Sequence, residues 1–420
     1  MATRQQTLVM IMLVALAFAT STMTALRAPG IPVGLAELIL IGCMIVHIPL
    51  GNGVHGGNLP NRFVPFLFAM LVAMLPGYFV TLTTEGQVPS ALYNLIASVW
   101  VVLLFAYLHF GFDHGRGEID MLARLFLLFS SVYFGAVLLL SVFDPAMVYL
   151  QDDIETLRLD GPGDEEGEGP VFRLVGFSTN PNQLALHSLV CAFFALELWK
   201  RNGFFLSVVC LGLAIAAGLM AQSDAFLFSA IALIGIWVTM GIVFNRSVVL
   251  GLVIIVPAVT AIALSIGPIV RDIQEVANAR DQGDTRFTLW ENGIAAGLER
   301  PFFGLGPGAW SGFEGPRGLE EAHNSAIDYF SNAGLLGITV LAIGVVVLLW
   351  RAFAAKEAAM LAGVVAILMF AAFHNVLRQP IMWLGLYYIA QRVWPGARTS
   401  AVRRRGRRRA RRTAGPGLPI

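Results

Sequence analysis

One histidine stands apart from the others as a candidate for proton chemistry. Of the seven histidines in the chain, most lie inside long apolar runs or at their ends, where a hydrogen-bonded structural role is the default. His323 instead lies in a long polar stretch, next to Asn324 and just before an apolar run. The ordinary pKa of a histidine side chain is about 6.5, so a neutral imidazole at this position can act as a general base.

Arginines in the polar stretches are candidates for anion binding. Arg173 lies shortly before an apolar run, and Arg280 and Arg286 lie in the same long stretch as His323. A guanidinium can bind a phosphate group through two parallel hydrogen bonds, which suits arginine to phosphate recognition at a membrane surface. For Arg173, an ion pair with a neighbouring carboxylate is the alternative interpretation.

Local patterns predict the elements that hold these residues. Asn180 and Pro181 are typical of a helix start, as N-cap and first helical residue. Residues 284–301 predict an amphipathic helix on the outer leaflet, because apolar side chains recur in it at helical spacing. Its Trp290 serves either membrane packing or sugar contact. The glycines in 304–308 form a turn cluster, and without a preceding strand they are not a dinucleotide-binding fingerprint.

The composition places these stretches in a polytopic membrane protein. Hydrophobic residues make up 57% of the 420 residues and charged residues 13%, and the mean hydropathy is +0.72. A helix needs about 20 apolar residues to cross a bilayer, which predicts an all-α protein with about 12 transmembrane helices. The predicted spans lie near 7–26, 31–50, 63–83, 90–110, 121–143, 184–199, 203–222, 225–244, 247–269, 329–350, 358–377 and 380–391.

The positions of Arg and Lys predict the orientation of the spans. Basic residues such as Arg62, Lys200 and Arg351 fall in alternate short loops, which are therefore cytoplasmic by the positive-inside rule. Both termini are then cytoplasmic, and two long insertions face outward. The first span also has the pattern of a cleavable signal peptide. The predicted organisation is helices in 1–143, an acidic periplasmic loop in 144–183, helices in 184–269, a large periplasmic catalytic loop in 270–328, helices in 329–391 and an Arg-rich cytoplasmic tail in 392–420.

The net charge of +1 combines regions of opposite sign. Ten of the 28 basic residues follow Gln391, which leaves 18 basic against 27 acidic residues, a charge of −9, in residues 1–391. The basic tail is suited to an anionic lipid surface, and no folded nucleic-acid reader accompanies it. The three cysteines lie in apolar runs, so we expect no disulfide framework and no cysteine metal site.

Several motifs follow one another in a fixed order between residues 170 and 340. They are Arg173 with Gly176, Asn180-Pro181-Asn182, Arg286 with Trp290, Gly304-Leu305-Gly306, Ala322-His323-Asn324 and Gly334-Leu335-Leu336-Gly337. As an ordered set they resemble the O-antigen ligase and Wzy-type surface-polysaccharide polymerase family of bacterial envelope proteins. The first five spans match only in hydropathy. One departure is Ser223-Asp224, where many relatives have Ser-Arg.

The resemblance implies a GT-C-like, metal-independent and inverting glycosyltransferase that uses no cofactor. Its donor is a glycan on an undecaprenyl diphosphate carrier, and its acceptor is a hydroxyl of another glycan or of lipid A-core. The reaction takes place at the periplasmic face of the bacterial inner membrane, alongside other membrane proteins of polysaccharide assembly. Arginines there can hold the leaving diphosphate without a divalent ion. The implied residues are Arg173, Arg286 and, more weakly, Arg280 for the diphosphate, His323 as the base, and Trp290, Asn324 and Asn182 as weak glycan contacts.

Two alternatives stay open beside this interpretation. A multi-span transporter or flippase of lipid-linked glycans has a similar outline, although transporters of this shape usually have similar halves and a long inward connection between spans six and seven. Here that connection is the short stretch from Trp199 to Gly203. Within the family, polymerisation of repeat units and ligation to lipid A-core share a donor and a leaving group, so the same motifs fit both.

Overall fold

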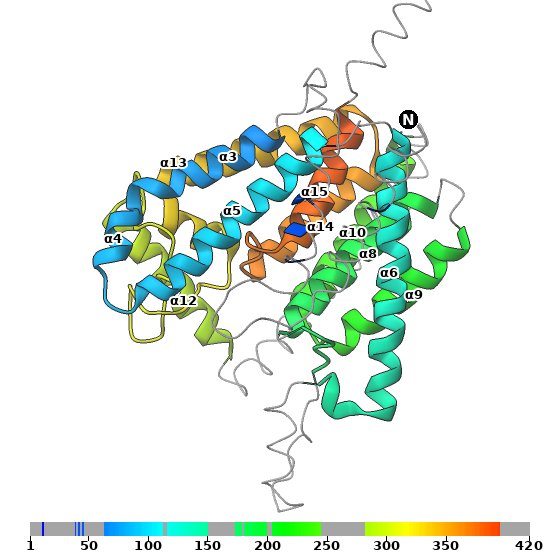
Figure 1. Ribbon diagram of the computed structural model, residues 1–420, viewed down its shortest axis with the longest axis horizontal. Coiled ribbons are helices and arrows are strands. Elements are labelled where there is room, and N and C mark those ends of the chain that lie inside the picture. Colours follow the sequence, from blue (N-terminus) through cyan, green and yellow to red (C-terminus); the bar gives the residue numbers. More distant parts are fainter. Residues whose placement is uncertain are drawn as a thin grey trace, which may run out of the picture.

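The computed structural model describes residues 63–111, 116–149, 173–178, 180–199, 204–244 and 282–394, together with single positions before residue 46. In these residues the regular structure is helical, apart from two isolated β-bridges (Figure 1). The elements are α3 Phe63–Met74, η1 Leu75–Gly77, α4 Tyr78–Thr83, α5 Gln87–Gly111, α6 Arg116–Phe143, η2 Pro145–Met147, α8 Pro181–Trp199, α9 Phe204–Met220, α10 Asp224–Phe244, α12 Gln282–Glu299, α13 Ser325–Ala354, α14 Ala358–Phe373 and α15 Pro380–Val393.

The core of the protein forms around α8 and α14. Every residue of α8 from Leu184 to Leu198 is buried, and this helix packs against α6, α9, α10, α14 and α15. The α14 helix is apolar on almost every side and packs against α8, α10, α13 and α15. A helix that is hydrophobic all round needs neighbours all round, and the sequence of these two helices therefore places them at the centre of the bundle.

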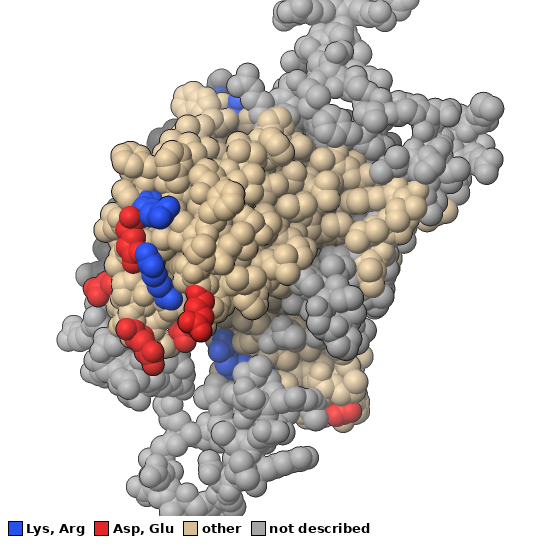
Figure 2. All heavy atoms as spheres, turned by 60° about the vertical axis from the view of Figure 1, so that its left-hand side comes forward, with Lys and Arg blue, Asp and Glu red and all other residues tan. Residues whose placement is uncertain are grey.

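The peripheral helices turn large apolar side chains outward. Phe79, Phe143 and Phe205 are 76%, 81% and 81% exposed, and a wide part of the surface in Figure 2 carries no charge. An apolar surface of this extent is typical of a face that meets lipid. Within the described residues, five helical segments are long and apolar enough to cross a membrane: Phe63–Thr83, Gln87–Leu108, Ile119–Phe143, Asp224–Phe244 and Ser325–Ala354.

Every predicted span that falls within the described residues coincides with a helical segment. The span predicted at 63–83 is interrupted by the 3₁₀ turn η1, where Pro76 removes a main-chain donor. The span at 247–269, nearly all of 7–26 and of 31–50, most of the acidic loop and the basic tail after residue 394 lie outside the described residues. The protein is thus an all-α, polytopic membrane protein, and the total of about 12 spans stays a prediction.

The segment between α12 and α13 lies against one end of the bundle, beside α4, α5 and α13 (Figure 1). The predicted amphipathic helix is confirmed as α12. Leu289 and Ala296 face the protein, whereas Phe287 and Leu298 are exposed, so the predicted apolar face points away from the protein body. That direction fits a helix lying on a membrane surface.

Candidate active site

His323 lies in a turn that is fixed on both sides. Before it, the main-chain N–H of Ala322 donates to Oδ1 of Asp328 at 2.7 Å. After it, Asn324 is the N-cap of α13, and its Oδ1 accepts from two main-chain N–H groups of the first turn at 3.0 and 3.2 Å. His323 itself is exposed and has a φ of 52°, a left-handed conformation that costs free energy in a non-glycine residue. Such strain at an exposed histidine favours a functional interpretation.

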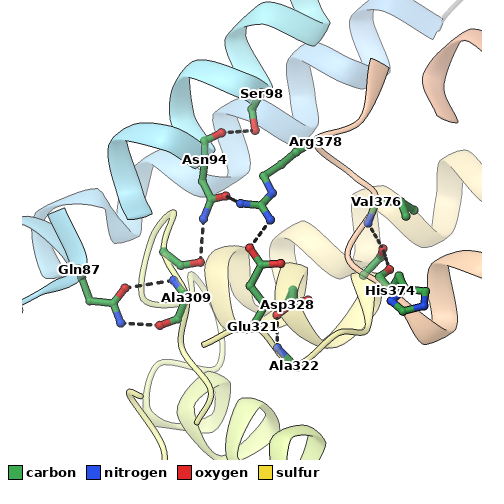
Figure 3. Close-up of polar contacts among 12 residues, drawn as sticks. Gln87, Asn94, Ser98, Ala309, Glu321, Ala322, Asp328, His374, Val376 and Arg378 are labelled. Carbon is green, nitrogen blue, oxygen red and sulfur yellow. Dashed lines mark hydrogen bonds and ion pairs between the residues drawn. The ribbon is translucent and has the colours of Figure 1, made fainter. Parts of the chain in front are cut away.

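The start of α13 is joined to the end of α14 by side-chain hydrogen bonds. Asn324 Nδ2 donates to the carbonyl of Ala372 at 2.8 Å, and Ser325 Oγ donates to the carbonyl of His374 at 2.7 Å. Ser325 Oγ also accepts from the main-chain N–H of Val376 at 3.0 Å (Figure 3). The two polar groups of Asn324 are therefore both engaged inside the protein. Its predicted glycan contact stays a prediction.

A second histidine lies beside the first. The ring centroids of His323 and His374 are 6.3 Å apart, with an angle of 77° between the ring planes. His374 is the C-cap residue of α14, and only 8% of its surface is exposed. The pair thus has one member open to solvent and one member buried behind it.

Basic side chains from separate segments lower the pKa of both histidines. Burial of part of its ring lowers the pKa of His323. The nearby carboxylate of Glu321 raises this pKa, and the guanidinium of Arg286 lowers it further. Burial lowers the pKa of His374 to about 3, with Arg286, His323 and Arg173 adding to the effect. Both imidazoles are therefore neutral near pH 7, as a general base must be before it accepts a proton.

These effects bring three of the predicted residues together. Arg286 comes from α12, Arg173 from the segment before α8, and His323 from the turn before α13, so residues far apart in the chain come within electrostatic range of His374 at one end of the bundle. Arg286 has no ion-pair partner among the residues that the structure describes. Arg280 lies outside the described residues.

Arg378 is a basic residue of the site that sequence reasoning missed. It forms an ion pair with Glu321 and donates to Oδ1 of Asn94 at 2.5 Å (Figure 3). Its guanidinium lies 5.1 Å from the centre of the Tyr93 ring. Because Glu321 stands two residues before His323, these contacts tie the histidine turn to α5. Arg378 is neutralised within the protein, which distinguishes it from Arg286.

The loop after α12 is anchored by amides of α5. Gln87 exchanges two hydrogen bonds with the main chain of Ala309, at 2.5 and 3.1 Å, and Asn94 Nδ2 donates to the carbonyl of Gly308 at 2.9 Å (Figure 3). The two amides are almost fully buried, and buried amides require such partners. They fix the loop that leads from α12 to His323.

A break in α13 explains two of the glycine motifs. Gly334 has a φ of 61° inside this helix, and a Cβ there would lie 2.5 Å from the carbonyl carbon of Phe302. A Cβ at Gly304 would likewise meet the main chain of Ala333 at 2.5 Å. The close approach is held by hydrogen bonds from Leu335 N to Pro301 O, Leu336 N to Phe302 O, Leu305 N to Ser331 O and Gly306 N to Asn332 O.

An apolar groove reaches the site from within the helices. Its volume is about 460 Å³, and it runs between α13, α14 and α15 with Phe63 and Phe66 of α3 at its side. Asn324, Ser325 and Ala326 line its part closest to His323, and nearly all the other lining side chains are apolar. The groove is therefore suited to a hydrocarbon chain whose polar end lies near His323.

The remaining predicted residues lie on the supporting helices. Asn180 accepts from the main-chain N–H of Asn182 at 2.8 Å, and α8 begins at Pro181, so the predicted helix start is confirmed. Trp290 is half-buried on α12, and its ring centroid lies 5.6 Å from that of Phe287. The glycan contacts predicted for Asn182 and Trp290 stay predictions.

Sequence reasoning gave His374 the structural role that is usual for a histidine at the end of an apolar run. No motif surrounds it, and its place beside His323 comes from the packing of α14 on α13, which neither helix encodes alone. Within the described residues no group of three or more His, Cys, Asp or Glu side chains is arranged to hold a metal ion.

Fold and site together define a multi-span helical membrane protein with a histidine and arginine cluster at one end of its bundle. Residues 209–342 match the family model described as O-antigen ligase. This match confirms the resemblance to the O-antigen ligase family that the motifs predicted. The comparison with curated proteins gives no match.

The matched residues contain α12, the glycine loop, the His323 turn and the break in α13. Arg173 and His374 lie outside the match, and the structure adds both to the cluster. The family supports a glycosyl-transferring membrane enzyme of the O-antigen ligase or polymerase type, with a lipid-linked glycan and an acceptor as substrates.

Proposed function

We propose that the protein moves a glycan from undecaprenyl diphosphate to an acceptor hydroxyl at the periplasmic face of the inner membrane. The observation that carries this proposal is the meeting of Arg286 and Arg173 with the neutral His323 and His374 at one end of the helices. Cationic groups for a leaving diphosphate and a neutral base for a hydroxyl are the two requirements of this reaction.

The reaction is a direct displacement at the anomeric carbon. The acceptor oxygen forms a bond to this carbon as the bond to the phosphate oxygen breaks, and the leaving diphosphate keeps that electron pair. His323 takes the proton of the acceptor hydroxyl, and the anomeric configuration is inverted. Arg286 and Arg173 stabilise the charge that develops on the diphosphate, which lets the protein work without a divalent ion.

The apolar groove supports a lipid-linked donor. The hydrocarbon of the carrier fits between α13, α14 and α15, and its diphosphate then emerges near Asn324, next to His323. Burial of hydrocarbon in such a groove is favourable by about 0.8 kcal/mol for each CH₂ group. The lipid part thus holds the donor while the reacting end stays at the membrane surface.

The test compares glycan transfer by purified variants supplied with a polyprenyl-diphosphate glycan and an acceptor. His323→Asn is the sharper variant beside His323→Ala, because asparagine tolerates the left-handed backbone of residue 323. We expect losses of about 10²- to 10⁴-fold for His323→Asn and about 10²- to 10³-fold for Arg286→Ala. Arg317→Ala is the control, since Arg317 is exposed and pairs with Glu299 away from the cluster.

Undiminished transfer by the folded His323 and Arg286 variants would remove the mechanism. A chelator should leave transfer intact; activity that is lost with chelator and restored by magnesium or manganese would indicate a metal-dependent oligosaccharyltransferase. Uptake of lipid-linked glycan into vesicles without any transfer would favour the transporter instead.

Polymerase and ligase differ in what accumulates when the protein is deleted. Single lipid-linked repeat units accumulate if it polymerises them, whereas long lipid-linked chains accumulate if it transfers finished chains to lipid A-core. Both reactions use the donor groups described above, so this measurement separates the acceptors while leaving the proposed mechanism in place.

A further inference from the structure

The proposed transfer reaction leaves the second histidine without a role. His374 is buried directly behind the exposed ring of His323, and the rings meet nearly at right angles with their centroids 6.3 Å apart. Edge-to-face contact at this separation is a favourable arrangement for two aromatic rings.

The separation of the two rings is set by the backbone rather than by the rings themselves. The two residues that follow His323, Asn324 and Ser325, bond to the carbonyls of Ala372 and His374 at 2.8 and 2.7 Å. Figure 3 shows His374 on the segment that these bonds hold against the start of α13. These two hydrogen bonds hold the backbone next to His323 against the backbone at His374, so the two side chains stay close enough for one to orient the other.

We propose that His374 is a positioning residue for His323: its buried imidazole orients the exposed imidazole toward the acceptor hydroxyl. The inference rests on the proposed role of His323 as the base. A catalytic base is commonly oriented by a third group that contacts it from behind. Here that group is an imidazole, whose one N–H and one lone pair can each take part in a hydrogen bond when the ring is neutral.

The charges around the pair explain why an imidazole suits this position better than a carboxylate. His374 faces Arg286 from α12, Arg173 from the segment before α8, and His323, while His323 also faces Glu320, Glu321 and Arg378. A carboxylate at residue 374 would form an ion pair with Arg286 and compete with the diphosphate for it. A neutral ring leaves the guanidinium to the substrate, and burial and the nearby cations keep His374 neutral, since its pKa lies at about 3.

The test compares His374→Phe, His374→Gln and His374→Ala in the full-length protein. Phenylalanine keeps a ring and removes the nitrogens, so we expect kcat to fall by about 10- to 100-fold, less than for loss of the base itself. KM for the lipid-linked donor should stay close to that of the parent, the pH profile of kcat should shift, and glutamine should restore part of kcat. A phenylalanine variant with the parent's kcat and pH profile would overturn the proposal, because packing alone would then be sufficient.

A second measurement does not depend on glycan transfer. Diethyl pyrocarbonate modifies neutral, accessible imidazoles, and mass spectrometry follows the modification of His323 over a range of pH in the folded protein. We expect His323 to react several-fold faster in His374→Phe than in the parent, because its ring is no longer held. Equal rates at every pH would overturn the positioning role.

The same labelling separates the two proposals. If the parent protein transfers no glycan but His323 is still labelled faster in His374→Phe than in the parent, the proposed function is contradicted and the contact between the two histidines is supported. His187→Gln is the matched control, since His187 is a buried histidine on α8 whose hydrogen-bond partner is Ser130 of α6. Faster labelling of His323 in this control would overturn the assignment to His374, because any loss of a buried histidine would then have the same effect.

Discussion

The two ends of the helix bundle differ in how their arginines are paired. At one end Arg392 of α15, whose side chain is 7% exposed, lies 3.1 Å from Asp120 of α6 and 3.8 Å from Glu197 of α8. At the other end Arg286 lies near two neutral histidines and has no ion-pair partner in the described part of the chain. The difference separates an arginine that joins helices through ion pairs from one that has no carboxylate partner among the described residues.

The physical reason for the difference is the cost of burying charge. Glu197 is 2% exposed, and a carboxylate in such a place is tolerated only with a partner in good geometry. Arg286 is half-buried, so part of its side chain stays open to solvent and its charge is not fully desolvated. Arg378 lies between these cases, because it stands in the site but is already neutralised by Glu321.

The largest expected effect is the loss of stability in Arg392→Ala. Removing one partner of a buried ion pair typically costs about 3–5 kcal/mol, and Arg392→Ala takes a cationic neighbour from both Asp120 and the buried Glu197. Thermal unfolding in detergent should therefore show a large decrease for Arg392→Ala, while transfer for each folded molecule stays close to that of the parent. Arg317→Ala breaks the exposed pair with Glu299 and should cost about 0–1 kcal/mol.

Equal stability of these two variants would contradict the structural role of the Arg392 pairs. If folded Arg392→Ala lost as much glycan transfer as Arg286→Ala, the proposed difference in role between the two arginines would be contradicted.

The second expected effect is a dependence of stability on pH that originates at the His323 end. The pKa of His374 is about 3 in the folded protein and 6.5 in its ordinary state, so the unfolded chain binds a proton first as the pH falls. The free energy of unfolding is then greatest above pH 6.5 and decreases as the pH falls below that value. Unfolding measured from pH 7 to 5 should show a smaller decrease in His374→Phe than in the parent. Parallel curves for the two proteins would contradict this assignment.

Hydropathy and capping patterns predict much of the architecture, because they depend on residues close together in the chain. The helices from α3 to α15 follow from apolar runs, and Asn180 and Pro181 predict the start of α8 from their own preferences. The glycine motifs are visible as turn signals, but their reason is the approach of Gly304 to the break at Gly334, which is a contact between distant segments.

The candidate site is predicted only in part, for the same physical reason. Arg173, Arg286 and His323 are marked by motifs, whereas His374 and Arg378 follow an apolar helix with no distinguishing neighbours. Their importance arises when α13 packs on α14 and when Glu321 meets Arg378. Sequence patterns therefore identify the first three residues, whereas His374 and Arg378 are identified only from the tertiary packing.

The smallest expected effect compares two helix caps of the same chemistry. Asn324 caps α13 beside His323, and Asn180 caps α8 through a hydrogen bond of 2.8 Å to the N–H of Asn182. Replacing either asparagine by alanine should cost about 0.5–2 kcal/mol of stability, as the loss of an N-cap usually does. Only Asn324→Ala also removes the bond to Ala372 that holds His323 near His374, so at similar stability it should lower kcat more than Asn180→Ala. Equal kcat values for the two variants would mean that the cap stabilises α13 without positioning the base.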